Sequence, residues 1–182
     1  KPDGIAVIEA PYLKDLIDHV EFDTIYHEHL CYFSLSALDR LFRSHGLEVV
    51  DVERLAIHGG SLRVTLAHAA AVQSGAARPS KAVEELRAEE SQWVDDPAFY
   101  AEFGRRVTQL RDDLRSLLAS LRSEGRRIAV YGASAKGSTL LNYCGIGKET
   151  LDFIVDRSTV KQGKFAPGVH LPILAADELA HR

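Results

Sequence analysis

The 182-residue sequence contains no methionine, even at its first position, and only two cysteines. Cys31 and Cys144 lie far apart and form no CxxC pair, which is typical of reduced thiols in a cytoplasmic protein. No apolar run reaches the roughly 18–20 residues that a membrane-spanning helix needs, and no secretory signal opens the chain. With a net charge of −4 and a pI near 6.1, the chain lacks the basic excess that nucleic acid or an anionic membrane attracts. We therefore expect a cytoplasmic protein that binds neither.

Hydrophobic residues make up 46% of the chain and charged residues 26%, an ordinary globular composition that can bury a sizeable core. The length suits one large domain, or one domain and part of a second. The opening residues KPDG lead directly into a strand-like run, as in the middle of a domain. We expect a fragment of a longer protein.

The first third of the chain predicts an α/β arrangement. The run GIAVIEA at residues 4–10 predicts a strand buried in a parallel sheet. Ser36 is placed to cap a helix that ends near Gly46, because apolar residues recur at helical spacing between them. Residues 47–55 predict a strand, and the alternation of SLRVTLAHA at residues 61–69 predicts a half-buried strand that pairs back antiparallel.

The rest of the chain predicts a helical connector followed by half of a doubly wound fold. Residues 70–80 have a linker composition. Two helices are predicted at residues 81–93 and 97–123, divided by a proline. Two buried strands are predicted at residues 127–132 and 151–158, with a glycine loop and a helix between them.

The glycine loop YGASAKGST at residues 131–139 combines small residues with a helix start, which lets backbone N–H groups face an anion. Lys136 precedes the second glycine, so the loop does not match the GxxxxGK[ST] pattern of a P-loop. Ala133 and Ser134 break the GxGxxG dinucleotide pattern, although Asp156 stands about where a ribose-binding acid would. The loop indicates a phosphate or nucleotide site, and a tight packing turn is the alternative.

The stretch YHEHLCYFS at residues 26–34 is unusually rich in proton donors and acceptors. One interpretation is zinc binding by HEH at residues 27–29, but no second ligand pair follows at suitable spacing. A structural polar cluster is the second interpretation. The third is acid–base catalysis, because a histidine beside a glutamate and a tyrosine can remove a proton next to a carbonyl and stabilise the enolate. The position after a predicted strand favours this third interpretation.

Four stretches in this order resemble the nucleotide-sugar C-methyltransferase family: YHEHLCYFSLSALDRLF, HGGSLRV, YGASAKGSTLLNYCGIG and KQGKFAPGVHLPI. The resemblance covers nearly the whole chain and implies methylation of a ring carbon beside a ketone in a nucleotide-linked deoxysugar. It implies that residues 1–72 are the end of a seven-stranded class I methyltransferase sheet. Residues 73–124 would be a linker and helical connector, and residues 125–182 a Rossmann-like unit that binds the nucleoside-diphosphate sugar.

The resemblance also implies roles for individual residues. His29 is the general base, Glu28 supports its imidazole, and Tyr26 donates to the enolate oxygen. His27 is assigned a structural role, and His58 in the predicted turn is an open case. The substrate-binding candidates in the glycine loop are Tyr131, Gly132, Ser134, Lys136 and Gly137. S-adenosylmethionine, and any zinc, are expected in an amino-terminal part that precedes this region in the family, so we expect no metal site in this chain.

Two other functions remain open on sequence alone. The first is a nucleotide- or NAD-binding module without chemistry, in which residues 125–182 bind the ligand and YHEHL is structural. The second is a metal-dependent hydrolase with zinc at the HEH segment.

Overall fold

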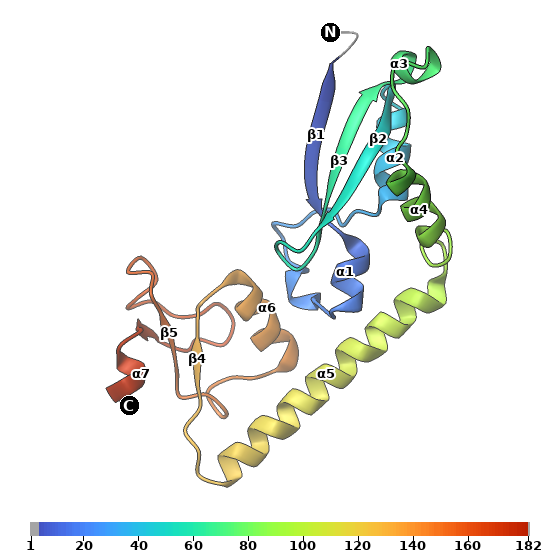
Figure 1. Cartoon of the computed structure of the whole chain (residues 1–182). Coiled ribbons are helices and arrows are strands. Elements are labelled where there is room, and N and C mark those ends of the chain that lie inside the picture. Colours follow the sequence, from blue (N-terminus) through green and yellow to red (C-terminus); the bar gives the residue numbers. More distant parts are fainter. Residues whose placement is uncertain (1–3, 182) are drawn as a thin grey trace. The chain divides into compact units, whose positions relative to one another are not determined.

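The computed structural model describes residues 4–181, which form two compact units. The first unit contains residues 4–21 and 31–104, and the second contains residues 22–30 and 105–181. Each unit has its own three-stranded sheet (Figure 1). The short segment at residues 22–30 therefore folds with a part of the chain that is remote from it in sequence.

The sheet of the first unit is antiparallel, in the order β1-β3-β2. Its strands are β1 (Ile5–Pro11), β2 (Leu47–Leu55) and β3 (Ser61–His68). The predicted strands at residues 47–55 and 61–69 are confirmed, together with their antiparallel pairing. A register shift between Val49 and Asp51 interrupts the β2–β3 ladder.

The prediction that residues 4–10 form a buried strand of a parallel sheet is wrong. β1 pairs antiparallel with β3 and is exposed along most of its length, with Ile5 at 68% and Val7 at 54% exposure. Among the described residues, no strand pairs with its other edge. An unbroken apolar run indicates that both faces of a strand are suited to burial, but it does not specify which strands cover it.

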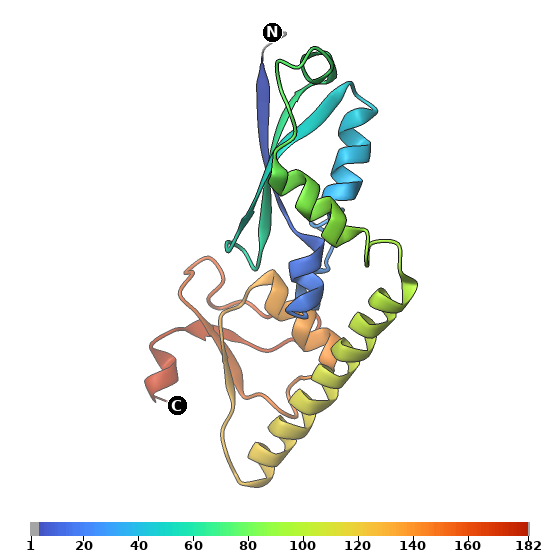
Figure 2. The ribbon, with the colours of Figure 1, turned by 45° about the vertical axis from the view of Figure 1, so that its right-hand side comes forward.

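Two helices pack on β2 and close the first core. They are α2 (Leu35–Arg43) and α4 (Lys81–Glu90), and Figure 2 shows both beside the sheet. On β3 the alternate residues Leu62, Val64 and Leu66 are buried, as the period of two predicts. Two shorter helices, α1 (Leu13–Asp18) and α3 (Ala69–Gln73), complete the unit. The buried cluster consists of Tyr12, Leu35, Leu38, Val49, Val52, Leu62, Val64, Leu66, Val83, Leu86 and Trp93.

The N-terminus of α2 is capped from two directions, and Ser36 is not the N-cap. Ser34 is the N-cap, since its hydroxyl oxygen accepts the Ala37 N–H at 3.1 Å. The Glu90 carboxylate, at the end of α4 and fully buried, accepts the N–H groups of Leu35 and Ser36 at 2.7 Å each. The Ser36 hydroxyl donates to the same carboxylate. All three first-turn N–H groups thus find acceptors, and α2 is bonded to α4.

The second unit has a parallel sheet in the order β4-β5-β6. Its strands are β4 (Ala129–Tyr131), β5 (Phe153–Asp156) and β6 (Ile173–Ala175). Helix α6 (Ala135–Cys144) joins β4 to β5, which confirms the predicted strand–loop–helix–strand order. A four-residue helix, α7 (Glu178–His181), follows β6.

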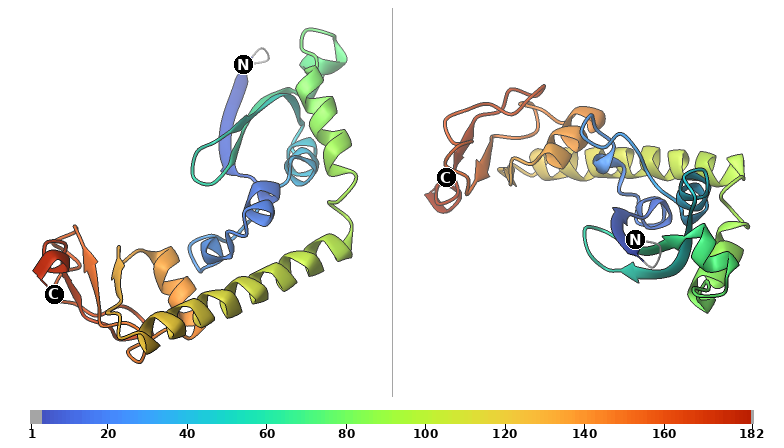
Figure 3. Two further views of the ribbon diagram at one scale, coloured as in Figure 1. Left: turned by 60° about the horizontal axis from the view of Figure 1, so that its bottom comes forward. Right: turned by 90° about the horizontal axis from the view of Figure 1, so that it is seen from above.

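The boundary between the units, after residue 104, falls within α5 (Pro97–Ser123), whose bounds match the predicted helix. No helix in the described part of the chain is long and apolar enough to cross a membrane. The 3-10 helix η1 (Phe22–Thr24) packs against α6. Figure 3 shows η1, in blue, beside the orange α6.

Replacing Glu90 with Gln puts an amide NH₂ against a backbone N–H in the buried cap. Because a buried donor without an acceptor costs roughly 1–3 kcal/mol, we expect the unfolding free energy of the first unit to fall by about 2 kcal/mol. Urea denaturation followed by Trp93 fluorescence measures this unit, since the single tryptophan lies in its core. The control is Glu85→Gln on the same helix, where the side chain is 62% exposed, with a change below about 0.5 kcal/mol. Equal effects of the two substitutions would contradict the capping role.

Candidate functional site

The segment that carries YHEHL forms a turn after η1 and not a strand. The Tyr26 N–H donates to the Thr24 carbonyl, and the His29 N–H donates to the Tyr26 carbonyl at 2.9 Å. This turn brings the Tyr26 and His29 rings together, with centroids 4.5 Å apart. His27 and Glu28 are exposed at the tip of the turn.

The structure thus joins two of the three residues predicted to carry out the proton chemistry. Tyr26 and His29 are half-buried neighbours, while no hydrogen bond or ion pair between Glu28 and His29 occurs in the described structure. The His27 ring meets the Tyr26 ring edge-on, at 6.1 Å. A turn therefore sets the orientation of these side chains, in place of the alternation that an extended segment would give.

An aromatic contact fastens this segment to α6. The Phe22 ring is 7% exposed and lies 5.0 Å from the Tyr143 ring, tilted by 54°. The Arg111 guanidinium lies over the Tyr143 ring, 5.9 Å from the ring centroid. Ring pairs at this separation add a favourable aromatic interaction to the burial of apolar area.

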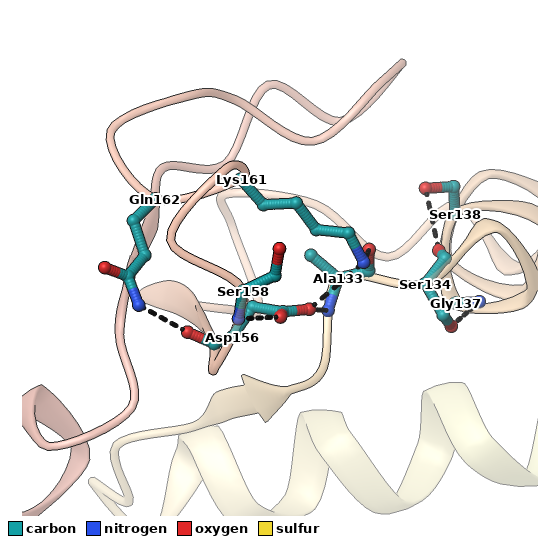
Figure 4. Close-up of polar contacts among 8 residues, drawn as sticks. All are labelled: Ala133, Ser134, Gly137, Ser138, Asp156, Ser158, Lys161 and Gln162. Atoms are coloured by element: carbon teal, nitrogen blue, oxygen red, sulfur yellow. Dashed lines mark hydrogen bonds and ion pairs between the residues drawn. The ribbon is translucent and has the colours of Figure 1, made fainter.

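The glycine loop is a tight connection between β4 and α6 (Figure 4). Gly132 has φ +100°, a conformation that side-chain-bearing residues rarely adopt, and its N–H donates to the Val155 carbonyl at 2.7 Å. Ser134 is the N-cap of α6, and its hydroxyl oxygen accepts the Gly137 N–H at 2.9 Å. The loop therefore holds the start of α6 beside the ends of two parallel strands.

Asp156, at the end of β5, is committed to closing this loop (Figure 4). Its carboxylate accepts the N–H groups of Ser158 and Ala133, at 2.7 Å each. These two backbone hydrogen bonds hold the pKa of Asp156 below its ordinary value. The Lys161 ammonium donates to the Ala133 carbonyl at 2.8 Å and lies 3.4 Å from the same carboxylate. Both oxygens of the Asp156 carboxylate therefore already accept hydrogen bonds from the loop itself.

A cavity of about 260 Å³ opens beside the start of α6. Of the five predicted substrate-binding residues, only Ser134 lines it, while Tyr131, Gly132, Lys136 and Gly137 do not. The opposite wall comes from the segment that follows β5. The lining residues are Ala133, Ser134, Ala135, Ser138, Lys161, Lys164, Phe165, Pro167 and Ile173.

Lys164 and Phe165 are the candidate residues that sequence reasoning missed. The Lys161 ammonium is engaged with Asp156 and the Ala133 carbonyl, whereas no hydrogen bond or ion pair of the Lys164 ammonium occurs in the described structure. Phe165 is 62% exposed, so its ring face is available at the cavity. The signal for them was present in KQGKFAPG, where two lysines and an aromatic residue stand within a glycine- and proline-rich loop.

The cavity wall is held by α6 through Asn142. Its side-chain NH₂ donates to the Ser138 carbonyl at 2.8 Å and to the Pro167 carbonyl at 3.0 Å. Gly168 lies directly against the Asn142 amide, and a Cβ at this glycine would overlap the amide oxygen. The loop that bears Lys164 is thereby packed against the last turns of α6.

A second cavity, of about 400 Å³, lies in the first unit near the turn between β2 and β3. Asp15 and Arg54 form an ion pair at its wall, at 2.6 Å, and the His19 imidazole lies 3.3 Å from the Gly59 carbonyl. His58 is in the left-handed conformation within the turn and does not line this cavity.

Within residues 4–181, no group of three or more His, Cys, Asp or Glu side chains converges in a way that could hold a metal ion. The HEH segment contributes no such set in its turn conformation.

A family model described as the C-methyltransferase C-terminal domain matches residues 56–182. The chain is also 44% identical over 180 residues to the C-methyltransferase NovU of Streptomyces niveus. This similarity covers 98% of the chain but 42% of NovU, so the chain spans less than half the length of that relative. Because the family model matches most of the chain, and the similarity to NovU extends along nearly all of it, the chain belongs to the family of C-methyltransferase C-terminal domains.

Proposed function

We propose that this chain carries the catalytic base and the sugar-nucleotide site of an S-adenosylmethionine-dependent C-methyltransferase. The substrate is a nucleoside-diphosphate deoxysugar with a ketone beside the methylated carbon. The observation that carries this proposal is the presence, in one compact unit, of the Tyr26–His29 pair and the cavity between Ser134 and Lys164. The similarity to NovU, which is named a C-methyltransferase, supports the class of reaction.

The cavity is suited to a diphosphate. Lys164 supplies a positive charge, and Ser134 marks the N-terminus of the ten-residue α6, where the helix dipole favours an anion. The exposed Phe165 ring offers a face for stacking a nucleobase. About 260 Å³ is less than a whole drug-sized ligand fills, so the diphosphate and part of the nucleoside occupy the cavity and the sugar projects from it.

The proton chemistry falls to the turn at residues 26–29. The ketone acidifies the neighbouring C–H group, and His29 takes that proton as general base. The electron pair moves onto the ketone oxygen, where the Tyr26 hydroxyl donates a hydrogen bond to the enolate. Glu28, next to His29 in the chain, supports the protonated imidazole by its negative charge.

S-adenosylmethionine, when bound, supplies the methyl group, so that the new C–C bond forms as the C–S bond breaks and the neutral thioether leaves. We place its site in a part of the full-length protein outside this chain, and likewise any zinc. The engagement of Asp156 within its own loop supports this placement, because both of its carboxylate oxygens already accept backbone hydrogen bonds. The unpaired edge of β1 and its exposed Ile5 and Val7 support a methyltransferase sheet that continues beyond the three strands described.

Thymidine diphosphate should stabilise this chain and NAD should not. At a hundred times its dissociation constant, a ligand raises the unfolding free energy by about 2.7 kcal/mol, which a thermal-shift assay detects. Lys164→Ala should raise the dissociation constant for thymidine diphosphate about tenfold, because the substitution removes a charged contact. Lys148→Ala is the matched control, an exposed lysine of the same unit outside the cavity, and should leave binding unchanged.

Lys136→Ala tests whether Lys136, as the sequence predicts, or Lys164, which lines the cavity, binds the diphosphate. A loss of binding with Lys136→Ala and none with Lys164→Ala would restore the assignment made from sequence. A shift with NAD alone would favour a dinucleotide-binding module and remove the methyltransferase proposal.

Replacing His29 with Asn should lower turnover of the full-length protein by at least about a hundredfold, because the general base is lost. Binding of thymidine diphosphate should remain, since the cavity residues are unchanged. Methyl transfer from labelled S-adenosylmethionine to the keto-sugar nucleotide measures turnover. His27→Asn is the control, because it changes an exposed histidine of the same turn to which no part in proton transfer is assigned. Near-normal turnover of His29→Asn would exclude His29 as the base.

A further inference from the structure

Two successive residues of α6 hold two different parts of the proposed site. Asn142 binds the loop that carries Lys164, through the Pro167 carbonyl and the close approach of Gly168. Tyr143 holds the turn that carries the base, through its ring contact with Phe22. Successive residues of an α-helix point about 100° apart, so Asn142 and Tyr143 can contact two separate segments of the chain.

The turn at residues 25–30 is held lightly elsewhere. Ile25 is 48% exposed and Leu30 is 88% exposed, and the backbone hydrogen bonds of Tyr26 and His29 link only nearby residues of the turn. By contrast, Phe22 is 7% exposed and rests on Tyr143. The direction in which His29 faces therefore depends on where η1 is seated on α6.

We propose that Tyr143 is a positioning residue, which acts through Phe22 to seat the turn that carries His29, and that α6 thereby sets the base in register with the bound sugar nucleotide. This inference rests on the proposed function and names the residue that couples its two parts. The Arg111 guanidinium over the Tyr143 ring keeps the ring in place from the α5 side. The N-terminus of the same helix borders the proposed diphosphate cavity, so one helix both lines that cavity and seats the turn that carries the base.

This arrangement predicts a separation of kinetic effects. A misplaced base lowers kcat, because a shift of about 1 Å in a reacting group can cost up to about a hundredfold in rate. An undisturbed cavity leaves the KM for the sugar nucleotide nearly unchanged. Loss of the Asn142 hydrogen bond should raise KM and leave kcat nearly unchanged, because it loosens the cavity wall and leaves the Phe22–Tyr143 contact in place.

The test uses the full-length protein with three substitutions on α6. Tyr143→Ala should lower kcat about tenfold and change KM by less than about twofold. Tyr143→Phe should keep kcat within about twofold, because the ring and not the hydroxyl makes the contact. Asn142→Ala should raise KM at least about threefold with a smaller change in kcat. Tyr100→Ala is the control, an exposed tyrosine with a ring contact to Phe99 in the other unit, and should change neither constant.

Hydrogen exchange of this chain provides a readout without turnover. Amides at residues 25–30 should exchange at least about threefold faster in Tyr143→Ala than in the wild type, while those at residues 161–170 should not change. Tyr143 is 43% exposed, so its truncation leaves the core of the unit intact. Thymidine diphosphate should still stabilise this variant.

Unchanged kcat and unchanged exchange in Tyr143→Ala would overturn the inference, as would an equal loss of kcat in Tyr143→Ala and Tyr143→Phe. Those outcomes leave the proposed function standing if the wild type binds thymidine diphosphate and transfers methyl. A wild type that does neither would overturn the proposed function, and with it the positioning role.

Discussion

The candidate substrate site depends on the Asp156 carboxylate. Two backbone N–H groups, from Ala133 before α6 and Ser158 after β5, converge on it, and Lys161 joins the same cluster. Their hydrogen bonds lower its pKa, so this contribution to stability is present above the ordinary carboxyl pKa and is lost as the pH falls through the lowered value. The carboxylate thus joins the two walls at the start of α6, while Asn142 joins them at its last turns.

The same cluster determines which ligands the cavity suits. Asp156 and Lys161 are bonded to each other and to the backbone, so part of the charge of Lys161 is already balanced within the loop. Lys164 is then the cation that faces the cavity without a counter-charge from the described residues. The start of α6 favours an anion, and the carboxylate at the strand end, where NAD-binding folds hold the ribose, is hydrogen-bonded within its own loop. These contacts support our proposal that the unit holds the diphosphate group of the substrate.

In both units the decisive polar contacts join residues that are far apart in the chain. Glu90 caps α2 from more than fifty residues away in the sequence. The sequence predicted Ser36 as the N-cap, but its N–H and its hydroxyl both donate to the Glu90 carboxylate. The strands at residues 47–55 and 61–69 and the helix at residues 97–123 were predictable, because the period of their apolar residues is a local property. The exposure of β1 was not predictable, since a run of apolar residues carries no information about which segments will cover it.

The sequence by itself determined the main strands, the longer helices, their order and the family, because periodicity, turn residues and four ordered motifs are local properties of the chain. It also pointed to Tyr26 and His29 as residues suited to proton chemistry. Only the tertiary structure decided that residues 22–30 fold with the second unit, and that Lys164 rather than Lys136 lines the cavity. These facts arise from the Phe22–Tyr143 contact and from the Asn142–Pro167 hydrogen bond. Such contacts join segments distant in sequence, and neither spacing nor composition encodes which distant partner a side chain will meet.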